Sequence, residues 1–133
     1  GAEQIGIADT IGVGTPIKVK KALAAALEYI DIAHISGHFH DTYGQALSNT
    51  LAALEMGVSE FDTSVAGLGG CPYAKGATGN VATEDVVYML HGMGIETGID
   101  LDKLVLAGER ISEFLGRRND SNVARALINK RSA

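Results

Sequence analysis

Short apolar runs alternate along this chain with longer segments in which apolar residues recur at helical spacing. The order strand, loop and helix recurs at least three times, which predicts an α/β fold with a parallel sheet. The expected strands cover about Gln4 to Asp9, Ile35 to His40 and Val58 to Ser64, with a weak fourth at Ile95 to Ile99. The expected helices cover about Pro16 to Tyr29, Gln45 to Met56, a segment capped by Thr83, Leu101 to Leu115 and Asn122 to Asn129.

The clearest strands have one apolar and one polar face. Ile35 and Phe39 share one face of the second strand, while Ser36, His38 and His40 share the other. This pattern fits a closed (β/α) barrel, whose outer face meets helices while polar groups line its mouth. A whole (β/α)₈ barrel takes about 250 residues, so residues 1–133 are expected to form only part of a barrel, with about three to four units.

Composition narrows the class of protein. Eleven Lys and Arg against 16 Asp and Glu give a net charge of −5, which disfavours nucleic acid or an anionic membrane as the main partner. A single Cys excludes a disulfide framework and fits a reducing compartment. No apolar run approaches the roughly 18 residues that span a bilayer, and no segment has the pattern of a signal peptide. The first residue is Gly1 rather than Met, which fits a processed end or a piece of a longer protein.

Candidate chemistry begins at the end of the second strand, in the sequence HFHDT. His38 and His40 lie two residues apart, so their imidazoles project to the same side of the strand. Two convergent imidazoles form half of a facial metal site, and active sites of barrels lie at the carboxyl ends of strands. The alternative is a pair of polar strand-end residues that hydrogen-bond to loops. His34 and His91 are isolated and are expected to be surface or hydrogen-bonded core residues.

A Gly-rich loop follows the third strand and runs to Asn80. Its glycines allow backbone N–H groups to approach a ligand. Cys71 is a candidate thiol acid/base or nucleophile, although most free cysteines are inert apolar residues. Asp9 ends the first strand and either faces the mouth or binds loop backbone, and Asn80 is by default a turn or cap residue. No Walker or Rossmann pattern is present.

Three segments together resemble the 3-hydroxy-3-methylglutaryl-CoA lyase family. They are DTIGVGTP from Asp9, HFHDTYGQAL from His38, and SVAGLGGCPYAKGATGN from Ser64 to Asn80. The resemblance covers essentially all of the chain but only the C-terminal part of the family's TIM barrel. Related Claisen-type synthases share the HxH strand, but they read GIGERAGN in the loop and lack its Cys. Cys71 therefore favours the lyase.

The resemblance implies metal-dependent retro-Claisen cleavage of 3-hydroxy-3-methylglutaryl-CoA to acetyl-CoA and acetoacetate, a reaction of leucine degradation. It implies Mg²⁺ or Mn²⁺ as cofactor, an acyl-CoA as substrate, and either a homodimer or pairing with the missing half of the barrel. The compartment is expected to be bacterial cytoplasm, or the mitochondrial matrix in a eukaryote. The implied site residues are Cys71, His38 and Asp9 for catalysis, His38, His40 and Asn80 for the metal, and Gly67, Gly69 and Gly70 for the substrate loop.

The family's remaining metal-binding Asp and an essential Arg lie in a first-strand motif that has no counterpart in this sequence. The chain is therefore expected to carry the metal and thiol half of the site and to be inactive alone. Two alternatives stay open: a related acyl-CoA synthase or pyruvate aldolase, and a non-catalytic half-barrel that acts by self-association.

Overall fold

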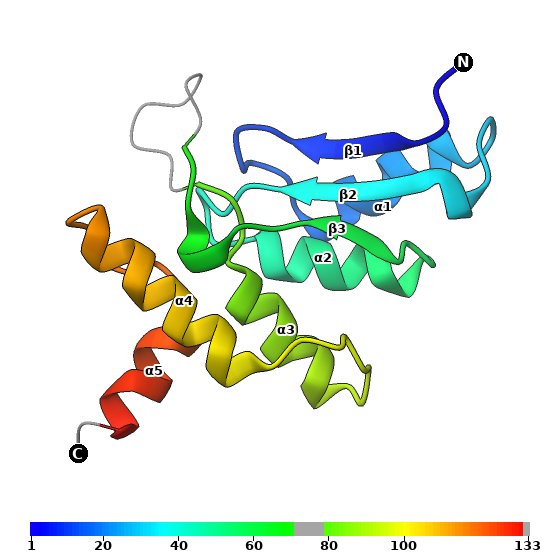
Figure 1. Cartoon of the computed structure of the whole chain (residues 1–133). Coiled ribbons are helices and arrows are strands. Elements are labelled where there is room, and N and C mark those ends of the chain that lie inside the picture. The colour runs from blue at the N-terminus through cyan, green and yellow to red at the C-terminus, as the bar shows by residue number, and fades with distance from the viewer. Residues whose placement is uncertain (71–78, 132–133) are drawn as a thin grey trace. The chain divides into compact units, whose positions relative to one another are not determined.

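The computed structural model describes residues 1–70 and 79–131 and shows the expected α/β fold, with parallel strands followed by helices (Figure 1). The chain divides into two compact units. The first comprises Gly1–Asp62 and Gly70–Asn80, and the second comprises Thr63–Gly69 and Val81–Ala133.

Three parallel strands in the order β1-β2-β3 form the sheet of the first unit. The strands are β1 (Ile5–Asp9), β2 (Ile35–Phe39) and β3 (Glu60–Asp62). The helices α1 (Pro16–Ala26) and α2 (Ala46–Glu55) follow β1 and β2, and a 3-10 turn, η1 (Ile32–His34), precedes β2. Helix α2 packs against both β2 and α1, so the helices of the first unit cover the sheet together.

The core of the first unit confirms the predicted apolar face of the second strand. Ile35 and Phe39 are each 2% exposed, and they are buried together with Leu23 of α1 and Val58 before β3. On the opposite, polar face Ser36 and His40 are buried, at 8% and 7% exposed, whereas the side chain of His38 is 32% exposed. Burial therefore restricts Ser36 and His40 more than His38.

Three helices and a 3-10 turn build the second unit. They are η2 (Val65–Gly67), α3 (Thr83–Gly92), α4 (Leu101–Phe114) and α5 (Asn122–Arg131), and α3 packs against each of the other three. The predicted helices at the C-terminal end of the chain are confirmed. Among the described residues, no helix is long and apolar enough to cross a membrane.

A buried carboxylate, Glu84, organises the second unit. Its two oxygens lie 3.0 and 2.9 Å from the backbone nitrogen of Ala66, which donates to them. Ala66 has φ of 56°, a left-handed conformation that a residue with a side chain adopts only when its surroundings hold it. A Cβ added at Gly108 of α4 would lie 2.3 Å from Glu84 Oε1, so close approach of α4 requires glycine there.

Burial raises the pKa of Glu84 above its usual 4.5, and the backbone hydrogen bonds oppose that rise. The carboxyl group is 0% exposed, so its ionised form is poorly solvated.

Four details of the sequence prediction are wrong. No strand forms over residues 95–99, because Gly98 has φ of 71° and Thr97 Oγ1 accepts a hydrogen bond from the Ile99 nitrogen, which makes a turn. Thr83 does not cap α3: Ala82 is the N-cap, and the Thr83 hydroxyl pairs with that of Thr63 at 2.8 Å. The first helix ends at Ala26 rather than Tyr29, and the third strand covers only residues 60–62.

Candidate metal and substrate site

The carboxyl end of the sheet in the first unit brings together four predicted site residues. His38 lies in β2 and His40 follows it, so their rings stand on the same side with centroids 5.2 Å apart. Asn80 forms an antiparallel bridge with His40, although the two residues are 40 positions apart in the sequence. The nitrogen of His40 donates to the backbone oxygen of Asp9 at 3.3 Å. The long loop therefore returns Asn80 to the histidine pair.

The return of the loop is fixed by backbone hydrogen bonds. The Asp41 nitrogen donates to the Gly79 oxygen at 3.2 Å, next to the bridge between His40 and Asn80. Asp41 also accepts a hydrogen bond from the Ala46 nitrogen at 2.9 Å, and so ties the end of β2 to the first residue of α2. Hydrogen bonds thus connect the end of β2 with the end of the long loop and with the first residue of α2, next to the two imidazoles.

The carboxylate of Asp9 is engaged by the loop that follows β1. Its oxygens accept hydrogen bonds from the nitrogens of Val13, at 3.2 Å, and Gly14, at 2.7 Å. The sequence left open whether Asp9 faces the mouth or binds loop backbone, and the structure shows the loop contacts. Its catalytic role stays a prediction.

Glycine is required within this loop at Gly12. Its φ is 69°, and a Cβ at this position would lie 2.7 Å from Thr42 Oγ1. The DTIGVG and HFHDT segments therefore approach each other too closely for a side chain, which accounts for a glycine in the first motif.

The donor set suits part of a divalent-cation site. Two imidazoles bound to one ion through metal–nitrogen bonds of about 2.1 Å have ring centres about 5 Å apart, and the observed separation is 5.2 Å. Within the described residues, the buried His40 Nδ1 has no hydrogen-bond partner. Imidazole nitrogen is a usual ligand of first-row transition-metal ions, and amide oxygen suits Mn²⁺ and Mg²⁺. His38, His40 and Asn80 therefore fit such an ion.

The same residues do not complete a site. Residues 1–70 and 79–131 contain no group of three His, Cys, Asp or Glu side chains that could hold a metal. A cation bound to His38, His40 and Asn80 would need further oxygen donors, from water, substrate or another part of the protein.

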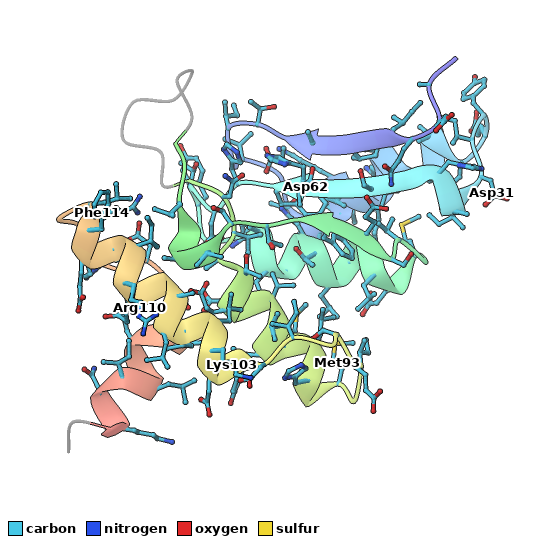
Figure 2. All side chains as sticks on the ribbon, viewed as in Figure 1. Asp31, Asp62, Met93, Lys103, Arg110 and Phe114 are labelled. Atoms are coloured by element: carbon cyan, nitrogen blue, oxygen red, sulfur yellow. The ribbon has the colours of Figure 1, made fainter. Side chains whose placement is uncertain are left out.

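One neighbour of the site was not assigned a role from the sequence. Asp62, which Figure 2 labels, ends β3 and is paired in register with His38. Its Oδ2 lies 3.3 Å from His38 Nδ1. The available signal was the position of both residues on the polar faces of adjacent parallel strands. Register between strands could not be read from one sequence with enough accuracy to pair them.

The remaining predicted site residues are Cys71 and three glycines. Cys71 is outside the described residues. Gly67 is buried in η2 with φ of 62°, and its nitrogen donates to the Ser64 oxygen at 3.1 Å. Gly69, with φ of 102°, and Gly70 are exposed. Gly67 and Gly69 belong to the second unit, and Gly70 belongs to the first.

The two isolated histidines behave as expected. His34 and His91 are both exposed, and His91 Nε2 lies 2.9 Å from the hydroxyl of Thr97. Neither residue contributes to the histidine pair of the first unit.

Known proteins match this chain closely. Residues 1–111 match the HMGL-like family. The chain is 60% identical to the mitochondrial hydroxymethylglutaryl-CoA lyase of Rattus norvegicus over 126 residues, which are 95% of this chain and 39% of the relative. The chain therefore spans about two fifths of that relative's length.

Solved structures agree with the sequence match. Hydroxymethylglutaryl-CoA lyase from Pseudomonas aeruginosa superposes with a TM-score of 0.93 at 53% identity, covering 96% of this chain and 43% of the other. An HMG-CoA lyase from Acinetobacter baumannii, solved in complex with coenzyme A and 3-methylmalate, gives a TM-score of 0.87 at 43% identity. That match covers 93% of this chain and 41% of the other.

Proposed function

Because the chain belongs to the HMGL-like family of TIM-barrel enzymes, we propose that it is part of an enzyme that cleaves 3-hydroxy-3-methylglutaryl-CoA to acetyl-CoA and acetoacetate. The observation that carries this proposal is the 60% identity to a hydroxymethylglutaryl-CoA lyase over 95% of the chain. The HFHDT strand end and the loop that contains Cys71 lie within the matched residues 1–111.

In the proposed site, His38, His40 and Asn80 hold Mg²⁺ or Mn²⁺. When bound, the cation polarises the tertiary hydroxyl of the substrate and lowers its pKa. The arrangement of the pair supports this role, since the rings stand side by side and the bridge to His40 keeps Asn80 close. The chain's own residues thus orient the hydroxyl whose proton must leave.

Cleavage also requires that a proton leaves the hydroxyl and that the departing acetyl-CoA enolate gains one. His38 and Cys71 are the proposed groups, because imidazole and thiol both have usual pKa values near neutral pH. The proton removed from the hydroxyl passes to one group as the C–C bond breaks and its electron pair goes to the enolate, and the enolate carbon of acetyl-CoA takes a proton from the other group. His38 can carry a proton only while its Nε2 is not bound to the cation. The Gly67 to Gly70 segment leads into the loop with Cys71, which would exclude water from the enolate.

The chain supplies one part of this site in the proposal. The remaining part of the TIM barrel supplies the other metal ligands and an Arg, and residues 1–133 alone are inactive. This chain together with that remaining part forms the complete enzyme. The structure supports the division, because the described residues contain no complete cluster of metal-binding side chains.

The proposed substrate is an acyl-CoA, and the proposed assembly is either a homodimer or a barrel closed by the missing half. The A. baumannii relative was solved with coenzyme A, which supports the substrate class. Relatives include a mitochondrial enzyme and a bacterial enzyme. The mitochondrial matrix and the bacterial cytoplasm are accordingly the two proposed compartments.

Product analysis tests the reaction. The complete enzyme would be incubated with Mg²⁺ and either 3-hydroxy-3-methylglutaryl-CoA, or acetyl-CoA with a 2-oxo acid, or pyruvate with an aldehyde. We expect acetoacetate and acetyl-CoA from the first mixture, and loss of that activity with a chelator that Mg²⁺ restores. Condensation product from the second or third mixture, with none from the first, would replace the lyase by a synthase or an aldolase.

A further inference from the structure

Asp62 and His38 are brought together by the backbone of the sheet. They are register partners in the parallel pair of β2 and β3, so their side chains leave the sheet side by side. Asp62 Oδ2 lies 3.3 Å from His38 Nδ1. The strand register places Asp62 next to His38. The contact between them therefore does not require a long side chain that extends from one strand to the other.

A carboxylate at Nδ1 selects one form of a neutral imidazole. The carboxylate can only accept a hydrogen bond, so the proton of the ring resides on Nδ1 and the lone pair resides on Nε2. Histidines that bind metals commonly donate their second N–H to a carboxylate or a carbonyl oxygen, which fixes the orientation of the ring. Asp62 stands in the position of such a partner.

His40 is supported in a different way. It is 7% exposed, its backbone nitrogen donates to the Asp9 oxygen, and it forms a bridge with Asn80. Within the described residues, its Nδ1 has no hydrogen-bond partner. Burial holds His40, whereas His38 has a side chain that is 32% exposed and needs a partner to define its ring.

We propose that Asp62 is a positioning residue that keeps the proton of His38 on Nδ1 and leaves the lone pair of Nε2 for the divalent cation. The proposal rests on the proposed function and deepens it, because it assigns the group that prepares one imidazole of the pair. Asp62 itself touches neither substrate nor metal. Its own side chain is 64% exposed, so its replacement leaves the core unchanged.

Metal affinity is the first readout. Mn²⁺ would be titrated into the metal-free complete enzyme, and the free ion would be followed by its electron paramagnetic resonance signal. We expect Asp62→Ala to weaken Mn²⁺ binding about tenfold, the lower end of the range for loss of such a partner. Asp62→Asn should lie between Asp62→Ala and the wild type, because its amide oxygen can still accept the bond from Nδ1–H.

Glu60→Gln is the matched control. Glu60 lies on the same strand and the same face, two residues from Asp62, and its carboxylate accepts a bond from Gln4 rather than from a histidine. The variant removes one negative charge from β3 and leaves His38 untouched. It should bind Mn²⁺ like the wild type, since an exposed charge of this kind contributes little.

The second readout is the tautomer of His38 in the metal-free protein, measured by nitrogen-15 NMR and assigned with His38→Gln. We expect protonation at Nδ1 in the wild type and in Glu60→Gln, and a shift toward protonation at Nε2 in Asp62→Ala. Unchanged affinity and unchanged tautomer in Asp62→Ala would overturn the positioning role while leaving the lyase proposal in place. Absence of Mn²⁺ binding by the wild type would overturn the metal site, and the role of Asp62 with it.

Discussion

The two imidazoles of the HFHDT segment differ in what holds them. His40 is enclosed and tied to its neighbours through its backbone, whereas His38 is half-buried and paired with a carboxylate. Within residues 1–70 and 79–131, the buried Nδ1 of His40 has no hydrogen-bond partner, which is unfavourable unless a ligand satisfies it. The two histidines therefore indicate a site in which a polar group gains its missing partner when a ligand binds.

Asp9 yields a prediction at the residue scale. Replacement by Ala leaves the nitrogens of Val13 and Gly14 without their carboxylate acceptor. We expect Asp9→Ala to lower the free energy of unfolding of the complete enzyme by about 1–3 kcal/mol, measured by urea unfolding. Asp9→Asn should lose less, because one oxygen remains. Full stability with a large loss of kcat in Asp9→Ala would show instead that Asp9 acts only in the chemistry.

At the residue scale the sequence could identify the histidine pair, because a spacing of two residues fixes the side of a strand. It could not determine that Asp9 binds its own loop, because an Asp at a strand end can face either the mouth or the backbone. Nor could it pair Asp62 with His38, since that contact depends on the register between β2 and β3.

At the scale of elements, the expected βα units are present, with their boundaries shifted by a few residues. Periodicity predicts strands and helices well where one face is buried, as at Ile35 and Phe39. The strand expected over residues 95–99 fails because alternation in a short segment does not distinguish a strand from a turn closed by Thr97 and Gly98. The hydrogen bond to Thr97 and the positive φ of Gly98 therefore determine the conformation of this segment.

The contact between α3 and η2 gives a prediction about pH. Burial raises the pKa of Glu84, so the folded state binds its proton more tightly than the unfolded state does. The contribution of this group to stability is therefore full below the usual pKa of 4.5 and is lost as the pH rises through the raised value. Glu84→Gln cannot ionise, so its stability relative to the wild type should increase with pH across this window.

Thermal unfolding of the complete enzyme at a series of pH values between 4 and 8 would test this. Glu113→Gln is the control, because Glu113 is an exposed glutamate of α4 and its replacement removes an equal charge. A difference between Glu84→Gln and the wild type that stays constant with pH would contradict the account of the buried carboxyl group.

At the scale of the whole molecule, the chain spans about two fifths of the rat lyase that it matches. The proposed cation has His38, His40 and Asn80 as protein ligands here, and it requires further oxygen donors. We expect residues 1–133 alone to release no measurable acetoacetate from 3-hydroxy-3-methylglutaryl-CoA, and the complete enzyme to release it. Comparable turnover by the isolated chain and the complete enzyme would contradict the division of the site.

The central claim is tested most directly by acetoacetate release from 3-hydroxy-3-methylglutaryl-CoA by the complete enzyme with Mg²⁺, compared with its Cys71→Ala variant. The account predicts metal-dependent release by the wild type, and a fall in kcat of about 10²–10⁴-fold in the variant with Mn²⁺ affinity unchanged. No release by a folded, metal-loaded wild type would contradict the lyase assignment. Equal turnover by Cys71→Ala and the wild type would contradict the role of the thiol.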